Sequence, residues 1–139
     1  MMSGMLRIPG GVFRMGSDCH YPEEAPVRSV SIDPFLLDET PVTNAAFARF
    51  AAATNYVTVA ETAPSSADYP DADPAMLQAG SAVFRMTAGP VPLTDSSQWW
   101  DYAFGACWRR PCGPGSSWEG LADHPVTHVT YADAEAFAA

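Results

Sequence analysis

The sequence of 139 residues contains no lysine, so its seven basic residues are all arginines, against 16 acidic residues. The net charge of −9 repels a phosphate backbone, which argues against a dedicated nucleic-acid-binding protein. No apolar run approaches the roughly 20 residues that span a bilayer. The amino end, MMSGMLRIPGG, also lacks the charged flank and apolar block of an export signal. We therefore expect an acidic cytoplasmic protein that binds neither membranes nor nucleic acid.

Cysteine is also scarce. Cys19, Cys107 and Cys112 are an odd number of thiols in a chain without a recognisable export signal. A framework of structural disulfides is therefore not expected, and the role of these three residues stays open.

Enough apolar residues are present for a folded core. They make up 47% of the chain, and 12% of the residues are aromatic, which excludes a disordered protein. The 13 prolines and 10 glycines are spread along the sequence rather than clustered. This punctuation favours short strands and shaped loops over a helical bundle.

The first forty residues predict strands. Leu6–Ile8 and Val12–Met15 flank a Gly10-Gly11 pair, which predicts a short hairpin. Val27–Asp33 alternates apolar and serine residues, the pattern of a half-buried strand. Phe35–Leu37 continues as a short extended piece.

Residues 44–53 predict the clearest helix, because this stretch holds six alanines. Thr43 is suited to cap its amino end, and Asn55 is suited to the left-handed residue that ends a helix. The expected core-facing stripe, at helical spacing, consists of Phe47, Phe50, Ala51 and Thr54.

The stretch Glu61–Pro92 predicts a long acidic loop, which in a compact domain is functional or mobile. Asp68, Asp71 and Asp73 lie close together in it. They lack the glycine and distal glutamate of a calcium-binding loop, so we expect them to be solvated.

The carboxyl-terminal part predicts a strand over Val126–Tyr131 and then a helix. Thr130 and Asp133 form an approximate capping box, and Phe137 begins an apolar helix face. The chain stops at Ala139 after about two turns, and isolated helices this short are marginally stable in water. We expect residues 1–139 to be the front part of a longer domain.

A zinc site is suggested by the spacing Cys107-x4-Cys112-x11-His124-x3-His128. A zinc finger needs both histidines on one helix turn, but Pro125 and the β-prone residues after it oppose a helix there. On a strand, residues four apart are about 13 Å from each other, too far to share one zinc ion. Copper(I) bound by the two cysteines is an alternative, less favoured than unpaired thiols without a role.

A serine hydrolase is disfavoured as well. The stretch Gly113–Ser117 reads GPGSS, which departs from the G-x-S-x-G nucleophile elbow. No strand–turn–helix pattern surrounds it, so the sequence gives no reason to treat Ser116 as a nucleophile.

A binding surface is suggested by Trp108, which is followed by Arg109, Arg110 and Pro111. An aromatic ring and a proline beside guanidinium donors can hold an extended peptide. Tryptophan is equally common in protein cores, so composition leaves both interpretations open.

Six stretches in order along nearly the whole chain carry a family resemblance. The sequence resembles the formylglycine-generating enzymes, also called sulfatase-modifying factors. The matching stretches are Ile8–Ser17, Pro41–Phe50, Trp99-Trp100, Gly105–Pro111, Gly113–Ser116 and Asp123–Val129.

The resemblance implies an α+β fold related to the C-type lectin architecture, with little regular secondary structure, that is incomplete in residues 1–139. It implies an oxidoreductase that uses O2 and copper to convert a cysteine to formylglycine. The substrate would be an unfolded or nascent sulfatase peptide of the form Cys-x-Pro-x-Arg. Calcium would be a structural ion.

The family's two copper cysteines and its calcium ligands match no residue of this chain, because they lie beyond the position of Ala139. We therefore expect no catalytic residue and no metal ligand here. Trp108 and Pro111 match residues that contact the substrate peptide in the family. The chain is thus predicted to supply scaffold and part of the peptide groove, and to be inactive by itself.

Two other functions stay open. One is a non-catalytic lectin-like binding module whose recognition surface is the Glu61–Pro92 loop. The other is a relative within the same superfamily, such as an iron-dependent sulfoxide synthase.

Overall fold

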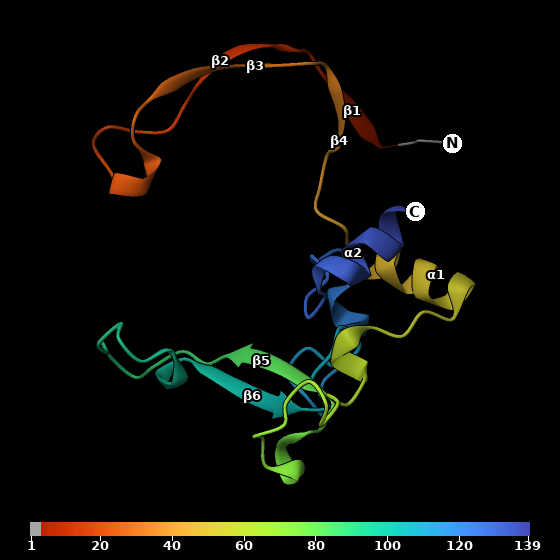
Figure 1. The fold of residues 1–139 in the computed structure, drawn as a ribbon. Helices are drawn as coiled ribbons and strands as arrows, with labels where there is room; N and C mark the ends of the chain where they lie inside the picture. Colours follow the sequence, from red (N-terminus) through yellow and green to blue (C-terminus); the bar gives the residue numbers. More distant parts are fainter. Residues whose placement is uncertain (1–3) are drawn as a thin grey trace. The chain divides into compact units, whose positions relative to one another are not determined.

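The computed structural model describes residues 4–139, and the chain divides into two units, Met1–Pro41 and Val42–Ala139. Regular structure in the described residues is limited to six short strands, two α-helices and several 3₁₀ turns (Figure 1). The strands form three separate two-stranded antiparallel sheets. This mixture confirms an α+β protein with little regular secondary structure.

The first unit contains four strands: β1 (Met5–Ile8), β2 (Gly11–Met15), β3 (Arg28–Ile32) and β4 (Phe35–Asp38). β1 pairs with β4, and β2 pairs with β3. The strands predicted around residues 27–33 and 35–37 are thereby confirmed as β3 and β4.

The predicted hairpin between the first two strands is wrong, because β1 and β2 do not pair with each other. Gly10 is not a turn residue. A Cβ atom at Gly10 would lie 2.7 Å from the Ile32 carbonyl oxygen and 2.8 Å from Pro34 Cδ. Glycine, which has no Cβ atom, therefore lets the backbone at position 10 pass close to the junction between β3 and β4. The chain reverses direction in the loop over residues 16–27, which joins β2 to its partner β3.

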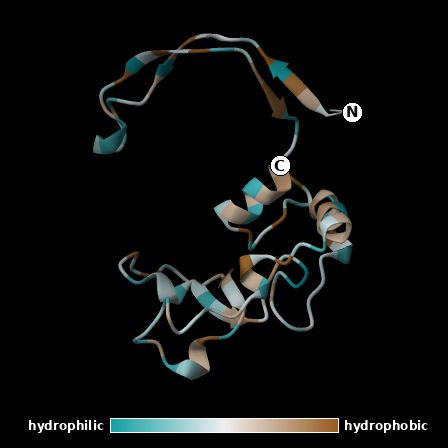
Figure 2. Ribbon diagram, turned by 45° about the vertical axis from the view of Figure 1, so that its right-hand side comes forward, coloured by the Kyte–Doolittle hydropathy of each residue, from teal (hydrophilic) through white to brown (hydrophobic). Residues whose placement is uncertain are grey.

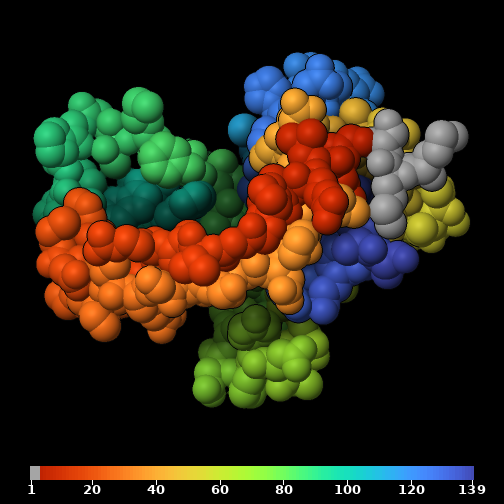
Figure 3. All heavy atoms as spheres, turned by 90° about the horizontal axis from the view of Figure 1, so that it is seen from above, coloured from red at the N-terminus to blue at the C-terminus, as the bar shows by residue number. Residues whose placement is uncertain are grey.

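None of the side chains in residues 4–41 is buried within the structure. In Figure 3 these residues are two adjacent rows of red and orange atoms, the two sides of the paired strands. Many of their large apolar side chains are exposed: Met5, Leu6, Val12, Phe13, Met15, Tyr21, Ile32, Phe35, Leu36 and Leu37. This unit therefore has strand pairing but no core of its own.

Helix α1 (Asn44–Thr54) opens the second unit, as predicted. The Thr43 hydroxyl accepts a hydrogen bond from the Ala46 amide at 3.2 Å, which caps the amino end. Asn55 is left-handed, with φ 55° and ψ 34°, and ends the helix as expected. Figure 2 colours the helix largely toward the hydrophobic end of the scale, in keeping with its alanines.

The core of the second unit forms around α1. Phe47, Ala51 and Trp108 are buried, and Phe47 packs edge-on against the Trp108 ring at a centroid distance of 5.3 Å. Partly buried side chains pack around them: Val42, Ala48, Phe50, Trp118, Val126, Val129 and Phe137. Two of the four residues in the predicted stripe are thus fully buried, whereas Thr54 is exposed.

Helix α2 (Tyr131–Ala138) begins with the predicted capping box between Thr130 and Asp133. The Asp133 carboxylate is 0% exposed and accepts hydrogen bonds from the Thr130 amide at 2.7 Å and hydroxyl at 2.8 Å. It also accepts from the Tyr56 hydroxyl at 3.0 Å and the Val59 amide at 3.2 Å. One buried carboxylate therefore joins α2 to the segment that follows α1.

The predicted strand over Val126–Tyr131 is wrong. His128 has a left-handed backbone, with φ 58°, which is incompatible with a continuous strand. Near this stretch the structure has one isolated bridge, between Thr43 and Pro125, and then α2 begins. β-branched residues favour strands only where a neighbouring strand is available, and this stretch has none beside it.

The prediction of a long acidic loop over Glu61–Pro92 is also wrong in part. This stretch contains the 3₁₀ turn η3 (Pro74–Met76) and the strand β5 (Gly80–Phe84). β5 pairs with β6 (Trp100–Phe104), and residues 85–99 separate the two strands in the sequence. The pairing depends on this distant partner, so local composition does not show it.

We predict that Asp133→Asn lowers the free energy of unfolding by about 2–3 kcal/mol, because an amide offers fewer acceptor sites to the donors that surround this buried carboxylate. Urea unfolding measures the change. The control is Asp123→Asn, at an exposed position. Equal stability of the two variants would contradict the prediction.

Candidate functional site

Trp108, one of the two predicted peptide-contacting residues, lies in the core of the second unit. It is 1% exposed, and its indole Nε1 has no hydrogen-bond partner among residues 4–139. The Arg109 guanidinium carbon lies 4.3 Å from the centroid of its ring, so a cation covers one indole face. In this structure Trp108 therefore anchors the loop after β6, and its contact with a peptide stays a prediction.

Pro111, the other predicted contact, is half-buried near the middle of the same loop. Its carbonyl oxygen lies 2.8 Å from Nε2 of His128, and the two are hydrogen-bonded. Because His128 has a left-handed backbone, a conformation uncommon for residues other than glycine, its ring is held by an unusual local geometry. Pro111 thus has a fixed partner on the segment that precedes α2.

Two pockets of the second unit share Ser81 and His128 in their walls. The first has a volume of about 660 Å³ and is lined partly by Asp68, Tyr69 and Tyr102. The second has a volume of about 750 Å³, and Pro111 lies in its wall. His128 therefore stands between a partly polar pocket and the pocket that contains Pro111.

The second pocket has an aromatic wall built on the β5–β6 pair. Phe84 and Trp100 are opposite each other in the register and meet edge-on at a centroid distance of 5.6 Å. Both rings are about half exposed, at 56% and 46%. Together with Pro111 they provide apolar and aromatic surface that an extended peptide segment can contact.

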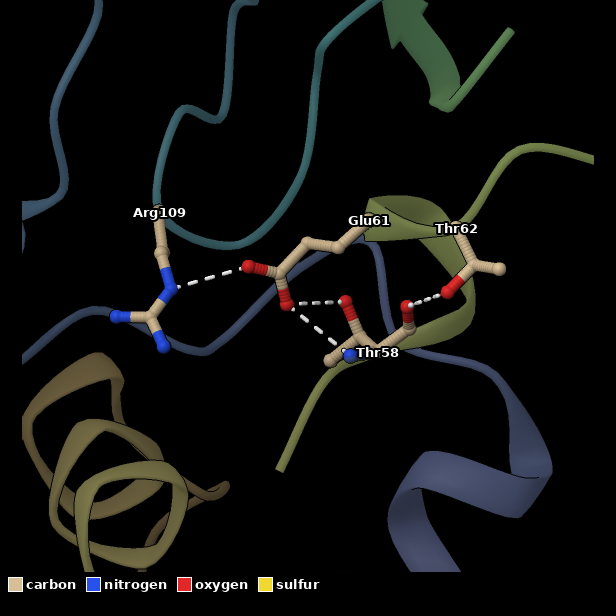
Figure 4. A network of polar contacts seen from close by, with 4 residues as sticks. All are labelled: Thr58, Glu61, Thr62 and Arg109. Carbon is tan, nitrogen blue, oxygen red and sulfur yellow. Dashed lines mark hydrogen bonds and ion pairs between the residues drawn. The ribbon is translucent and has the colours of Figure 1, made fainter. Parts of the chain in front are cut away.

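A network of polar contacts joins the 3₁₀ turn η2 (Val59–Glu61) to the loop after β6 (Figure 4). Glu61 Oε1 accepts a hydrogen bond from Arg109 Nε at 3.0 Å. Its other oxygen, Oε2, accepts from the Thr58 amide at 3.0 Å and from the Thr58 hydroxyl at 2.9 Å. The carboxylate of Glu61 therefore caps its own turn with one oxygen and holds Arg109 with the other.

The electrostatics of Glu61 follow from these contacts. Partial burial by itself raises the pKa of the Glu61 carboxyl, but the hydrogen bonds from Thr58 and Arg109 outweigh this effect and lower the pKa below its usual value. The ionised form is therefore the one that the fold stabilises.

The zinc pattern that was considered from the sequence, and disfavoured there, is not assembled into one site. Cys107 is 1% exposed, whereas Cys112 is exposed, and His128 Nε2 is engaged by Pro111. Among residues 4–139, no group of three His, Cys, Asp or Glu side chains is placed to hold a metal ion. A copper ion that a substrate thiol must reach does not fit a ligand as enclosed as Cys107.

Other residues considered from the sequence have local roles. Asp68 lines the first pocket, while Asp73 accepts from the Ala75 amide at 2.9 Å and caps η3. The Ser116 hydroxyl donates to the Gly113 carbonyl at 2.7 Å and accepts from the Cys112 amide at 3.0 Å. Ser116 is therefore a turn residue.

Glu61, Arg109 and His128 form contacts that the sequence did not predict. The Thr58-x-x-Glu61 spacing is a capping-box pattern, so the turn η2 was open to prediction. Nothing local signals the bond between Glu61 and Arg109, which are 48 residues apart.

Comparison with known proteins shows that the whole chain matches one protein family. Residues 1–139 match the family described as Sulfatase-modifying factor enzyme 1-like domain. Over 99% of its length the chain is 51% identical to a formylglycine-generating enzyme of Mycobacterium tuberculosis, of which it covers 46%. It is 41% identical, over 97% of its length, to the formylglycine-generating enzyme of Thermomonospora curvata, of which it covers 43%.

A relative with a different name is also similar. The chain is 37% identical, over 97% of its length, to the inactive C-alpha-formylglycine-generating enzyme 2 of Bos taurus and covers 42% of it. The chain thus spans less than half the length of each of these curated relatives.

We predict that the contribution of Glu61 to stability depends on pH. Because its pKa is lowered in the folded state, this contribution is present above the unfolded pKa of about 4.3 and is lost as the pH falls through the folded value. The gap in unfolding free energy between the unsubstituted protein and Glu61→Gln should therefore be larger at neutral pH than at pH about 3. Urea unfolding at both pH values measures it.

The control for this prediction is Glu119→Gln, at an exposed position of η5 (Glu119–Leu121). The difference in unfolding free energy between Glu119→Gln and the unsubstituted protein should be small at both pH values. A gap for Glu61→Gln that does not shrink in acid would contradict the assignment.

We predict that the three thiols differ in reactivity with a colorimetric disulfide reagent. Cys19 and Cys112 are exposed and should react quickly, whereas Cys107 should react only as fast as the structure opens. Cys112→Ala should remove a fast-reacting thiol, and Cys107→Ala should not. Loss of a fast thiol in Cys107→Ala would contradict the burial of this residue.

Proposed function

This chain belongs to the family of the Sulfatase-modifying factor enzyme 1-like domain, and on that premise we propose that it is part of an enzyme that converts a cysteine of a sulfatase into formylglycine. The observation that supports this function best is the 51% identity, over 99% of the chain, to a protein named formylglycine-generating enzyme. A second such enzyme at 41% identity supports it as well.

In this proposal, residues 1–139 are the amino-terminal part of a longer enzyme domain. The support is that the chain aligns over almost its whole length but covers 46% of the first relative. These residues supply scaffold and one wall of the substrate site, and the complete enzyme supplies the reacting groups. The relationship to the C-type lectin fold and a cytoplasmic location stay predictions.

The substrate in this proposal is an extended sulfatase peptide of the form Cys-x-Pro-x-Arg, unfolded or nascent. The pocket lined by Phe84, Trp100 and Pro111 supports it, because apolar and aromatic grooves suit extended, proline-containing segments. Pro111 contacts the peptide directly. Direct contact by Trp108 requires its ring, now 1% exposed, to become accessible in the complete enzyme.

The cofactors in this proposal are copper for the oxidation by O2 and calcium as a structural ion. The ligands of both are assigned to parts of the complete enzyme outside these residues. The support is that the chain covers 46% of the first relative, so more than half of that enzyme lies outside the aligned residues. No step of the reaction is therefore assigned to a side chain described here.

We predict that the full-length protein, loaded with copper(I) in air, converts a Cys-x-Pro-x-Arg peptide, and that residues 1–139 alone do not. Mass spectrometry detects the replacement of CH2SH by CHO. The control peptide carries alanine in place of the cysteine. A full-length protein without turnover would refute the proposed function, and turnover by residues 1–139 alone would refute the division of roles.

A second candidate function is a non-catalytic binding module. It is favoured by one specific observation, the 37% identity to a relative named as inactive. A binding measurement with the same peptide, made beside the conversion assay, separates the two functions: tight binding by the full-length protein without conversion would favour the module.

A further inference from the structure

The loop between β6 and η5 contains both predicted peptide contacts but has little regular structure of its own. Within it, the backbone of Cys107 and the backbone of Arg110 exchange hydrogen bonds of 3.2 and 2.9 Å, which closes one tight turn. Further turns follow it, since the Gly113 amide donates to the Arg110 carbonyl at 2.9 Å and the Ser116 amide donates to the Gly113 carbonyl at 3.1 Å. These local turns do not tie the loop to the rest of the unit, so contacts with outside residues decide where it lies. Packing of the Trp108 ring against Phe47 supplies one such contact, and polar contacts to Arg109 and Pro111 supply two more.

The first polar contact comes from η2. Glu61 Oε1 holds Arg109 Nε at 3.0 Å, and the guanidinium carbon of Arg109 lies 4.3 Å from the Trp108 ring centroid. A charge-assisted bond of this kind constrains the orientation of a planar guanidinium. The position of Glu61 itself is set by its two hydrogen bonds from Thr58, a residue that is 0% exposed. Glu61 therefore acts on the loop through Arg109.

The second polar contact comes from the segment before α2. His128 Nε2 lies 2.8 Å from the Pro111 carbonyl oxygen, and the left-handed backbone of His128 aims the ring. A non-glycine residue in this conformation costs free energy, which the surrounding structure must offset. His128 also lines both pockets, and Pro111 lines the second one. A change at His128 would therefore alter the wall that Pro111 forms.

We propose that Glu61 and His128 are positioning residues for the substrate peptide: Glu61 holds Arg109 over Trp108, and His128 holds Pro111 in the wall of the pocket. The proposal rests on the proposed function, since the peptide is the ligand for which the loop is held. Neither side chain takes part in the chemistry. Each keeps the Trp108–Pro111 loop in the conformation in which Pro111 lines the pocket for the peptide.

The test for Glu61 uses full-length Glu61→Gln. Glutamine can still cap η2, because either glutamate or glutamine serves in a capping box, but its neutral amide cannot replace both acceptor oxygens. We expect KM for the Cys-x-Pro-x-Arg peptide to rise about tenfold with kcat unchanged, the pattern of lost uniform binding. Glu119→Gln is the matched control and should leave KM unchanged.

A double-variant cycle shows whether Glu61 acts through Arg109. In the Arg109→Gln background, Glu61→Gln should have little further effect on KM, because its partner is already absent. Additive effects of the two substitutions would overturn this part of the proposal.

The test for His128 uses a pair of variants. His128→Asn tolerates the left-handed backbone but is too short to reach Pro111, so KM should rise. His128→Gln places an amide nitrogen at nearly the distance of Nε2 and should restore part of the binding. His20→Asn, at an exposed position of the first unit, is the control. Equal KM for His128→Asn and the unsubstituted protein would overturn the role of His128.

A readout independent of turnover is amide hydrogen exchange in residues 106–110, which should rise at least about threefold in Glu61→Gln and in His128→Asn. Unchanged exchange would overturn the positioning of the loop, and faster exchange with unchanged KM would overturn its importance for the peptide. If the unsubstituted full-length protein converts no peptide, the proposed function fails, while exchange still decides whether these residues hold the loop.

Discussion

Burial of the Trp108 indole is the interaction on which the second unit depends. Its ring meets Phe47 of α1 edge-on at 5.3 Å and Trp118 at 6.0 Å, while Arg109 covers another part of it. Because Trp108 belongs to a loop, its burial fixes that loop to a helix far away in the sequence. The polar contacts of Arg109 and Pro111 can then form between side chains whose separation is already set by the core.

The first unit has no buried aromatic residue comparable to Trp108 among residues 4–41. Its four strands have defined partners and register, but none of the side chains in residues 4–41 is buried within the structure. Two-stranded sheets are marginally stable in water without apolar surface to pack against. The exposed apolar side chains of these strands therefore require further apolar surface for a stable fold.

The comparisons and the structure bear on different parts of the function. Relatives named as formylglycine-generating enzymes and one named as inactive align with almost the whole chain, at 51%, 41% and 37% identity. The aligned residues are therefore similar in sequence to relatives of both names. The structure shows that contacts of Arg109 and Pro111 join the loop after β6 to η2 and to the segment before α2.

The sequence by itself determined the family, from motifs in order, and the local features: the cap at Thr43, the left-handed end at Asn55, and the capping box before α2. Each of these involves residues a few positions apart, so composition and spacing are sufficient. Only the tertiary structure decided the strand partners, the burial of Trp108, and the bond of Glu61 to Arg109 across 48 residues. Strand pairing and side-chain contacts of this kind join distant segments, and they form only after a shared core has brought those segments together.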